Sequence, residues 1–245
     1  MQALWNTIFY EPIYNALVFI MNTVTLGDVG LAIVALTVLV KFILAPLTRK
    51  SIRSQILMKR MEPELKLLKK EFPNKEEQAK KTFELYKKYG TNPFSGCLVV
   101  LLQLPIIFAL YYVFYKGLSL DASSLYSFVK IPDVVHTNFL GFFEMHSKSI
   151  ILALFAGITQ FIQGYLATPV KAKVEVVKEM PVEPKTFQEE LSNSMQMNIR
   201  YVLPVFIAFI AYQISAAVAL YWIVSNVFTI VQEWIIRRKL ERNQI

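Results

Sequence analysis

The longest uncharged stretch of the chain is Tyr201–Gln232, YVLPVFIAFIAYQISAAVALYWIVSNVFTIVQ, and its length restricts how the chain can be arranged. As one helix, its 32 residues would extend about 48 Å, whereas the hydrocarbon core of a bilayer is roughly 30 Å thick. The stretch is too long for one membrane-spanning helix, and it forms two only if flanking residues are included. We therefore predict a hairpin of transmembrane helices at 197–213 and 216–236, with a turn at Gln213-Ile214-Ser215.

The composition of the whole chain is typical of a polytopic membrane protein. Of the 245 residues, 55% are hydrophobic and 18% are charged, whereas a soluble domain has about 45–50% apolar and roughly 25% charged residues. Residues 1–40 contain no Lys or Arg, but Arg49–Asn92 contains 13. Such long uncharged blocks exclude two classes of protein: a soluble enzyme with one buried core, and a disordered chain. The single Cys97 excludes a scaffold of internal disulfides.

Three further apolar blocks are long enough to cross a bilayer. They predict transmembrane helices at 29–48, 93–115 and 149–167. Segment 116–148 is then an extracytoplasmic loop. Segment 168–196, which contains three prolines and balanced charges, is expected to be a flexible cytoplasmic loop.

The N-terminal segment 1–28 is predicted to lie on the membrane. Its apolar stretch is short, because Glu11 and Asn22 interrupt it, and it is rich in the aromatic residues that are enriched at the membrane interface. We expect an amphipathic helix at residues 3–22 in the plane of the interface, with a short, tilted span as the alternative. No basic region and no cleavage site of a signal peptide stand out.

The distribution of Lys and Arg orients the predicted helices. Arg49–Asn92, with 13 basic residues, is expected to be cytoplasmic, and Lys116–Lys148, with three, to be outside. Thr168–Arg200 contains five basic residues and the tail 237–245 contains four. Both lie inside only if Tyr201–Gln232 crosses the membrane twice. We therefore predict five transmembrane helices, with the N-terminus outside and a basic C-terminal tail in the cytoplasm.

The cytoplasmic segment 49–92 is predicted to be a helical hairpin. Apolar residues recur at helical spacing in its first half: Met61, Leu65, Leu68 and Phe72. Phe72-Pro73-Asn74 ends this helix, and Asn74 with Glu77 resembles the capped start of a second helix that ends at Tyr89-Gly90. The hairpin either only connects two spans or is a docking surface for an acidic partner, lipid headgroups or ribosomal RNA.

Polar side chains are few inside the predicted spans, and Lys41 is the most costly of them. A Lys inside a span costs about 2.5–3.5 kcal/mol on insertion scales, unless it extends to the interface. Lys41 either does so or faces a water-filled cavity, where it attracts an anionic group, with Thr37 one turn away on the same face. The other polar residues of the spans either bond neighbouring helices or line one hydrated groove. They include Gln103, Gln160, Gln163, Tyr221, Ser225 and Asn226.

The residue patterns of known enzymes do not occur in the chain. His136 and His146 fall in the predicted outer loop, there is no His-Glu-x-x-His or phosphate-binding loop, and Cys97 has no histidine in any span to activate it. We expect no catalytic residues, no cofactor and no metal. The predicted spans also lack the interior carboxylates that ion-coupled transporters commonly use, apart from Glu233 at the inner edge.

Four segments, in this order, resemble the YidC-type membrane protein insertases, including their mitochondrial and chloroplast relatives. The segments are Leu36-Thr-Val-Leu-Val-Lys-Phe-Ile-Leu-Ala-Pro-Leu-Thr48, Tyr89-Gly-Thr-Asn-Pro-Phe-Ser-Gly-Cys97, Leu102-Gln-Leu-Pro-Ile-Ile-Phe-Ala-Leu-Tyr-Tyr112 and Leu220-Tyr-Trp-Ile-Val-Ser-Asn226. With the order of the five spans and the basic hairpin, the resemblance covers nearly the whole chain.

The resemblance implies an all-α fold of five transmembrane helices around a hydrophilic groove that is open to the cytoplasm and the lipid and closed to the outside. In this family a basic residue, usually Arg, receives the hydrophilic tail of a client protein, and Lys41 falls at its position. Other matching groove positions are Thr37, Gln103, Gln163 and Tyr221. A client helix would slide between the second and last spans, past Phe108, Tyr111 and Trp222. The turn before the last span often contains Pro or Gly in relatives, but not in this chain.

The sequence thus predicts a multi-pass insertase of the bacterial plasma membrane that inserts client membrane proteins and helps them fold. Its expected partners are newly made membrane proteins and the lipid bilayer. The ribosome and a protein translocon are further candidates, and no small-molecule substrate is expected. The alternatives are a small polytopic transporter or channel, and a scaffold that only assembles other membrane proteins.

Overall fold

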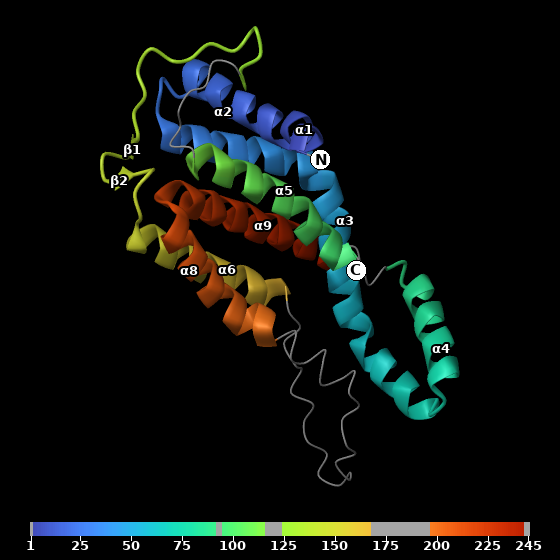
Figure 1. Ribbon diagram of the computed structural model, residues 1–245. Helices are drawn as coiled ribbons and strands as arrows, with labels where there is room; N and C mark the ends of the chain where they lie inside the picture. The colour runs from blue at the N-terminus through green and yellow to red at the C-terminus, as the bar shows by residue number, and fades with distance from the viewer. Residues whose placement is uncertain (1, 92–94, 116–123, 168–196, 243–245) are drawn as a thin grey trace.

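The computed structural model describes residues 2–91, 95–115, 124–167 and 197–242, which are mostly helical (Figure 1). The helices are α1 (Gln2–Trp5), η1 (Asn6–Tyr10), α2 (Glu11–Thr23), α3 (Val29–Glu71), α4 (Lys75–Lys88), α5 (Ser95–Tyr115), α6 (Ile150–Ala167), η3 (Asn198–Val202), α8 (Leu203–Ile214) and α9 (Ala216–Arg242). Two short strands, β1 (Asn138–Phe139) and β2 (Phe143–Glu144), pair antiparallel. The predicted all-helical class is confirmed, and the predicted loop 168–196 lies outside the described residues.

The N-terminal helix runs without a break through α1, η1 and α2, because the residues at their junctions keep helical backbone angles. It lies beside α3 in the bundle (Figure 1). One face is buried, and this face includes Tyr14, Leu17, Val18 and Met21. The exposed residues Leu4, Ile8 and Phe19 lie on the opposite side. The helix is therefore amphipathic, and its position in the membrane interface stays a prediction.

Helix α3 is 43 residues long and joins the first predicted span to the first predicted helix of the hairpin. The first span was predicted to end at residue 48, two residues after Pro46, which lacks the N–H that would bond the carbonyl four residues earlier. The helix instead continues through Pro46 and Pro63. Polar groups gather beside Pro46: the Gln232 amide donates to the Ala45 carbonyl at 3.0 Å, and the Thr48 hydroxyl donates to Oε1 of Gln232 at 3.0 Å. Packing against α9 thus supports α3 at the proline.

The hairpin turn between α3 and α4 lies at the position expected from the sequence. Oδ1 of Asn74 accepts a hydrogen bond from the backbone N–H of Glu76 at 3.0 Å, which caps the start of α4. Gly90 follows the end of α4 with a φ of +60°, a conformation that favours glycine. In Figure 1, α4 returns along the last turns of α3.

The uncharged stretch Tyr201–Gln232 forms two helices. Helix α8 ends at Ile214, and α9 begins at Ala216 after an extended Ser215. The turn contains no Gly or Pro, yet the first N–H groups of α9 find partners in the preceding loop. The N–H of Ala216 donates to the carbonyl of Ser147 at 2.8 Å, and the next N–H along α9 donates to the carbonyl of Met145 at 3.1 Å. The break therefore lies within the predicted turn, and tertiary contacts stabilise it.

Helix α9 also continues beyond its predicted end at 236, so that residues 237–242 of the expected tail are helical. Arg237 explains part of this extension. Its guanidinium bonds the carboxylate of Glu233 at 2.6 Å and the carbonyl of Leu166, near the C-terminal end of α6, at 2.6 Å. The basic residue thus joins two helices.

The centre of the bundle is α9, which packs against α3 on one side and α6 on the other (Figure 1). Every residue from Ser215 to Trp222 is buried, and three of them are alanines, which allow helices to approach closely. Among the described residues, three helices are long and apolar enough to span a membrane: Val29–Met58, Ile150–Ala167 and Ala216–Arg242. Two shorter apolar helices, Gln103–Phe114 and Arg200–Ile214, overlap the other two predicted spans, and the division into five spans stays a prediction.

Residues 124–148 cover the end of the bundle at which α3 and α9 begin, which we call the loop end. The N–H of His136 donates to the carbonyl of Gly27 at 2.8 Å, and the N–H of Val29 donates to the carbonyl of His136 at 3.0 Å. Gly27 has a φ of +89°, and a Cβ there would lie 2.1 Å from the Val134 carbonyl oxygen, so the contact requires glycine. We call the opposite end, where α3 extends to α4, the hairpin end.

Candidate functional site

The side chain of Lys41 lies inside the bundle between α3 and α9. It is only 7% exposed, and its Nζ donates to Oγ1 of Thr229 on α9 at 3.2 Å. The Thr229 hydroxyl in turn donates to the carbonyl of Ser225 at 2.9 Å. A buried ammonium must keep hydrogen-bond partners, because an isolated charge in a low-dielectric interior is costly. Lys41 thus reaches across to the neighbouring helix.

Thr37 is buried one turn from Lys41, toward the loop end. Its hydroxyl donates to the carbonyl of Ile33 at 2.6 Å, a bond within its own helix. The two residues share a face of α3, as the i, i+4 spacing predicted.

Gln103 of α5 and Tyr221 of α9 are joined directly, since Nε2 of Gln103 donates to the Tyr221 hydroxyl. Tyr221 is buried. The polar residues Tyr221, Ser225, Thr229 and Gln232 recur at spacings of four, four and three, so they lie on one face of α9. Along this face the structure brings together side chains of α3, α5 and α9.

Gln163 makes its described hydrogen bond within α6, where its Oε1 accepts from Nε2 of Gln160 at 3.0 Å. A hydrogen bond between side chains of α6 and α9 is made by Thr159, whose hydroxyl accepts from Nδ2 of Asn226 at 3.2 Å. Asn226 lies on a different face of α9 from the residues that meet α3 and α5. The hydrogen bonds therefore join Gln103 to Tyr221 and Lys41 to Thr229, but they leave Gln163 on the α6 side.

The three aromatic residues expected along the client path differ in exposure. Phe108 is 50% exposed and contacts Trp5 edge-on, with ring centroids 6.5 Å apart. Tyr111 is partly buried and lies edge-on to Tyr112, at 5.7 Å. Trp222 is only 8% exposed and belongs to the main hydrophobic core. Phe108 thus lies at the surface, whereas Trp222 lies in the core.

Sequence analysis missed Thr229 and Gln232, the two residues of α9 that bond α3. Their spacing from Tyr221 and Ser225 was the available signal, because a polar residue at every turn marks one helix face. The signal was incomplete, since the sequence alone does not show which helix lies opposite that face.

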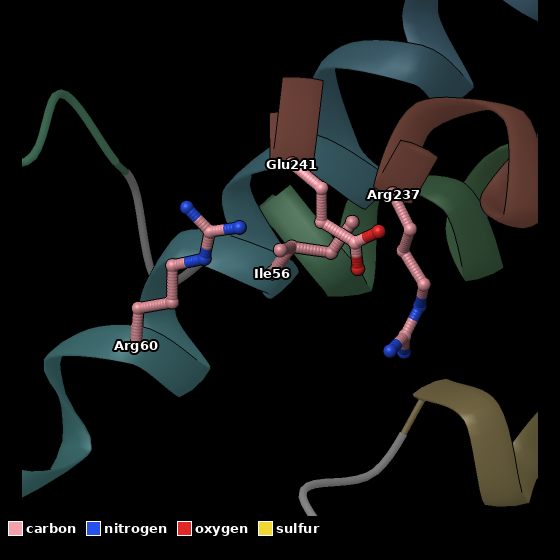
Figure 2. A pocket seen from close by; sticks show the side chains of 4 residues that line it. All are labelled: Ile56, Arg60, Arg237 and Glu241. Atoms are coloured by element: carbon pink, nitrogen blue, oxygen red, sulfur yellow. The ribbon is translucent and has the colours of Figure 1, made fainter. Parts of the chain in front are cut away.

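A cavity of about 230 Å³ lies farther along the contact between α3 and α9, toward the hairpin end. Figure 2 shows its lining: Ile56, Arg60, Arg237 and Glu241. The Arg60 and Glu241 side chains point toward each other across it, whereas Arg237 points away. Between this cavity and Lys41, α3 and α9 are joined by the Thr48–Gln232 bond and by a small apolar cluster that includes Ile52 and Ile236. The cavity is therefore separate from Lys41.

The histidines of the loop end make local contacts. Nδ1 of His146 lies 3.4 Å from Oε1 of Glu144, and His136 bonds the start of α3 through its backbone. In the part of the chain that the structure describes, no three His, Cys, Asp or Glu side chains form a group that could hold a metal ion.

A comparison with protein families matches residues 20–243 to the family described as 60Kd inner membrane protein. The chain belongs to this family, the YidC-type insertases. The protein named membrane protein insertase YidC in Fusobacterium nucleatum subsp. nucleatum is 30% identical over 234 residues, which cover 94% of this chain and 97% of the relative. The protein of the same name in Oceanobacillus iheyensis is 28% identical, with coverage of 98% and 86%.

Longer YidC proteins also match. The membrane protein insertase YidC of Campylobacter jejuni is 32% identical over 235 residues, which are 96% of this chain but 38% of the relative. The crystal structure of an active YidC insertase with its first transmembrane domain resolved has a TM-score of 0.54 at 19% identity, and the match covers 91% of this chain and 45% of that chain. This likeness supports the YidC fold for the bundle.

Proposed function

We propose that this chain is a membrane protein insertase of the bacterial inner membrane. It receives the hydrophilic tail of a client in a groove at Lys41 and releases the apolar helix of the client sideways into lipid. The observation that carries this proposal is the buried ammonium of Lys41, which bonds across the bundle to Thr229 in a chain of the YidC family. A charge is rare inside a membrane protein, and its usual reason is function.

The charge of Lys41 gives the groove its preference for acidic tails. A carboxylate that reaches the ammonium forms a charge-assisted hydrogen bond, which is about twice as strong as a neutral one. The attraction is also stronger in the interior than in water, because the dielectric constant is lower there. Gln103 of α5 and Tyr221, on the same face of α9 as Thr229, supply neutral hydrogen-bonding groups. These groups solvate the polar tail without any covalent step.

The groove lowers the free-energy barrier to insertion, because it shortens the distance that the polar tail of the client must cross without water. Peptide groups that lose water in hydrocarbon cost several kcal/mol each. A hydrated pocket that reaches partway across the bilayer removes part of this cost. Burial of the client's own apolar helix supplies the driving force, at about 0.8 kcal/mol per methylene. The chain therefore needs no nucleotide for this step.

The direction of transport follows from the charges and from the loop end. The 13 Lys and Arg of Arg49–Asn92 support a cytoplasmic hairpin end, and hence five crossings with the N-terminus outside. Residues 124–148 cover the opposite end, which supports a groove without an outer opening. The client helix leaves between α5 and α9, past Phe108 and Tyr111. The basic hairpin is the place for an acidic partner such as a ribosome, and a translocon is a second candidate.

The test is insertion into liposomes that contain this protein alone. Two single-span clients that differ only in an acidic or a neutral tail are presented to the wild type, Lys41→Arg and Lys41→Glu, and insertion is read by protease protection of the tail. Lys41→Arg should keep both clients, because the charge remains. Lys41→Glu should lose the acidic client by more than about tenfold, since the variant places two like charges together.

A third client with a basic tail separates electrostatics from misfolding. Lys41→Glu should insert this client at least as well as the wild type does, which a misfolded protein would not. Equal insertion of the acidic client by the wild type and Lys41→Glu would refute the proposed mechanism. Solute flux through the liposomes without any client would favour a transporter instead.

A further inference from the structure

The acceptor of the Lys41 ammonium is a neutral hydroxyl. Thr229 donates its own proton to the Ser225 carbonyl and so presents its oxygen lone pairs to Lys41. The chain of hydrogen bonds therefore runs from Lys41 to Thr229 to the backbone of α9. Because the last acceptor is a carbonyl that belongs to a helix, the Thr229 oxygen has a fixed position and direction.

The buried carboxylate of α9 does not neutralise Lys41. Glu233 lies one turn beyond Thr229, but its carboxylate is held by Arg237 at 2.6 Å. The Thr37 hydroxyl is turned to the Ile33 carbonyl of its own helix. Among the described residues, the Lys41 ammonium thus bonds a neutral hydroxyl and no carboxylate, which leaves it able to pair with a carboxylate from a client.

We infer that Thr229 is a positioning residue that holds the Lys41 ammonium inside the groove while leaving its charge available to the client. The inference rests on the proposed function, because it assigns the charge of Lys41 to tail capture. Without this acceptor the four-carbon side chain would turn toward water at the membrane surface, as Lys side chains near span ends do. A carboxylate at the same place would hold Lys41 equally well but would neutralise it.

The experiment compares Thr229→Val with Thr229→Ser in the full-length reconstituted protein. Valine has nearly the shape of threonine but lacks the hydroxyl, and serine retains it. A membrane-impermeant amine reagent is applied from the hairpin side, and mass spectrometry measures the modified fraction of Lys41. In parallel, the rates for the acidic-tailed and neutral-tailed clients are measured, and their ratio is the readout of positioning.

The expected result has two parts. In Thr229→Val, modification of Lys41 rises and the acidic-to-neutral ratio falls by about tenfold, the size of one hydrogen bond to a charged group. Thr229→Ser restores both. The matched control is Thr159→Val on α6, because the Thr159 hydroxyl also donates to a carbonyl four residues earlier, at 2.9 Å, but accepts from the uncharged Asn226. This control should leave the ratio and the modification of Lys41 unchanged.

Three outcomes would overturn the inference. Unchanged modification of Lys41 in Thr229→Val would show that the hydroxyl does not hold it. An equal loss of both clients, or the same loss in Thr159→Val, would show a merely structural role. These failures differ from that of the proposed function, which is judged by Lys41→Glu: if that variant discriminates between tails while Thr229→Val behaves as the wild type, only the role of Thr229 is wrong.

Discussion

Helices α3 and α9 are held in place at both ends of the bundle, but by contacts of different kinds. At the loop end, backbone groups of 27–29 and 216–217 bond backbone groups of residues 136–147. Toward the hairpin end, the contacts are made by side chains: Lys41 with Thr229, and Thr48 with Gln232. Backbone bonds are fixed by the fold, whereas side-chain bonds can be exchanged for bonds to water or to a client. The difference agrees with the proposal that a client enters from the hairpin end while the loop end stays closed.

One-sided chemical access should give the largest contrast between the two ends. With Cys97 replaced, Thr37→Cys should react with a membrane-impermeant thiol reagent from the hairpin side only, because residues 124–148 cover the other end. Phe142→Cys is the control, since Phe142 is 86% exposed at the loop end and should react only from the opposite side. Vesicles that expose either the hairpin end or the loop end are treated with a fluorescent, membrane-impermeant maleimide, and the labelled fraction of each cysteine is measured. Reaction of position 37 from the loop side would reveal a through-channel.

Gly27 tests how strongly the loop end depends on its backbone geometry. Gly27→Ala should lower the free energy of unfolding by about 3 kcal/mol, because the new Cβ adds a clash with the Val134 carbonyl to the unfavourable φ. Gly141→Ala is the matched control, with a φ of +75° but no atom within 4 Å of the new Cβ. It should cost only about 1 kcal/mol. Thermal unfolding in detergent compares them, and equal losses would exclude the steric explanation.

The smallest effect is expected in the hairpin, where Glu64 of α3 accepts hydrogen bonds from Lys88, the last residue of α4, and from Tyr89, which follows it. The Tyr89 hydroxyl, followed by Lys88, lowers the pKa of Glu64 below its usual 4.5. A lowered pKa in the folded state means that the contact stabilises the hairpin above the usual pKa and is lost as the pH falls through the lowered one. The group is exposed, so the effect is small.

Electron paramagnetic resonance measures this loss. Spin labels at the exposed positions Leu67 and Phe83 should show a broader distance distribution below the pKa of Glu64 than at neutral pH. Glu64→Gln should remove the pH dependence, because its side chain does not ionise in this range. A broadening that persists in Glu64→Gln would assign it to other carboxylates of the hairpin.

The parts of the fold that were predicted correctly depend on local signals. An uncharged stretch too long for one span predicted the break near Ser215, and the Asn74 cap predicted the start of α4. Two other predictions also depended on local signals, but tertiary contacts changed the outcome. The first span was predicted to end at residue 48, yet α3 continues past it and bonds α9 there. Arg237 was assigned to a tail, yet it bonds Glu233 and the end of α6.

The candidate site shows the same limit. Hydropathy was sufficient to find Lys41 as a costly charge. The resemblance to the YidC-type insertases then selected Gln103 and Tyr221 from the other polar residues of the spans, and the structure joins these two by a hydrogen bond. Thr229 was missed because a threonine in an apolar helix is common and costs little. Its importance arises only from the side chain opposite, and a sequence does not specify which helix faces are in contact.

The length of α3 has a mechanical consequence. Its 43 residues form a rod of about 65 Å, and Pro46 divides it into a short arm with Lys41 and a long arm that carries the hairpin. A tilt of about 10° at Pro46 would displace the far end of the long arm by roughly 6 Å, because that arm is about 37 Å long. A force applied at the hairpin therefore exerts a large torque on the Gln232 contacts beside Pro46. Binding of a partner to the hairpin would in this way shift the Lys41 ammonium, which lies five residues from Pro46.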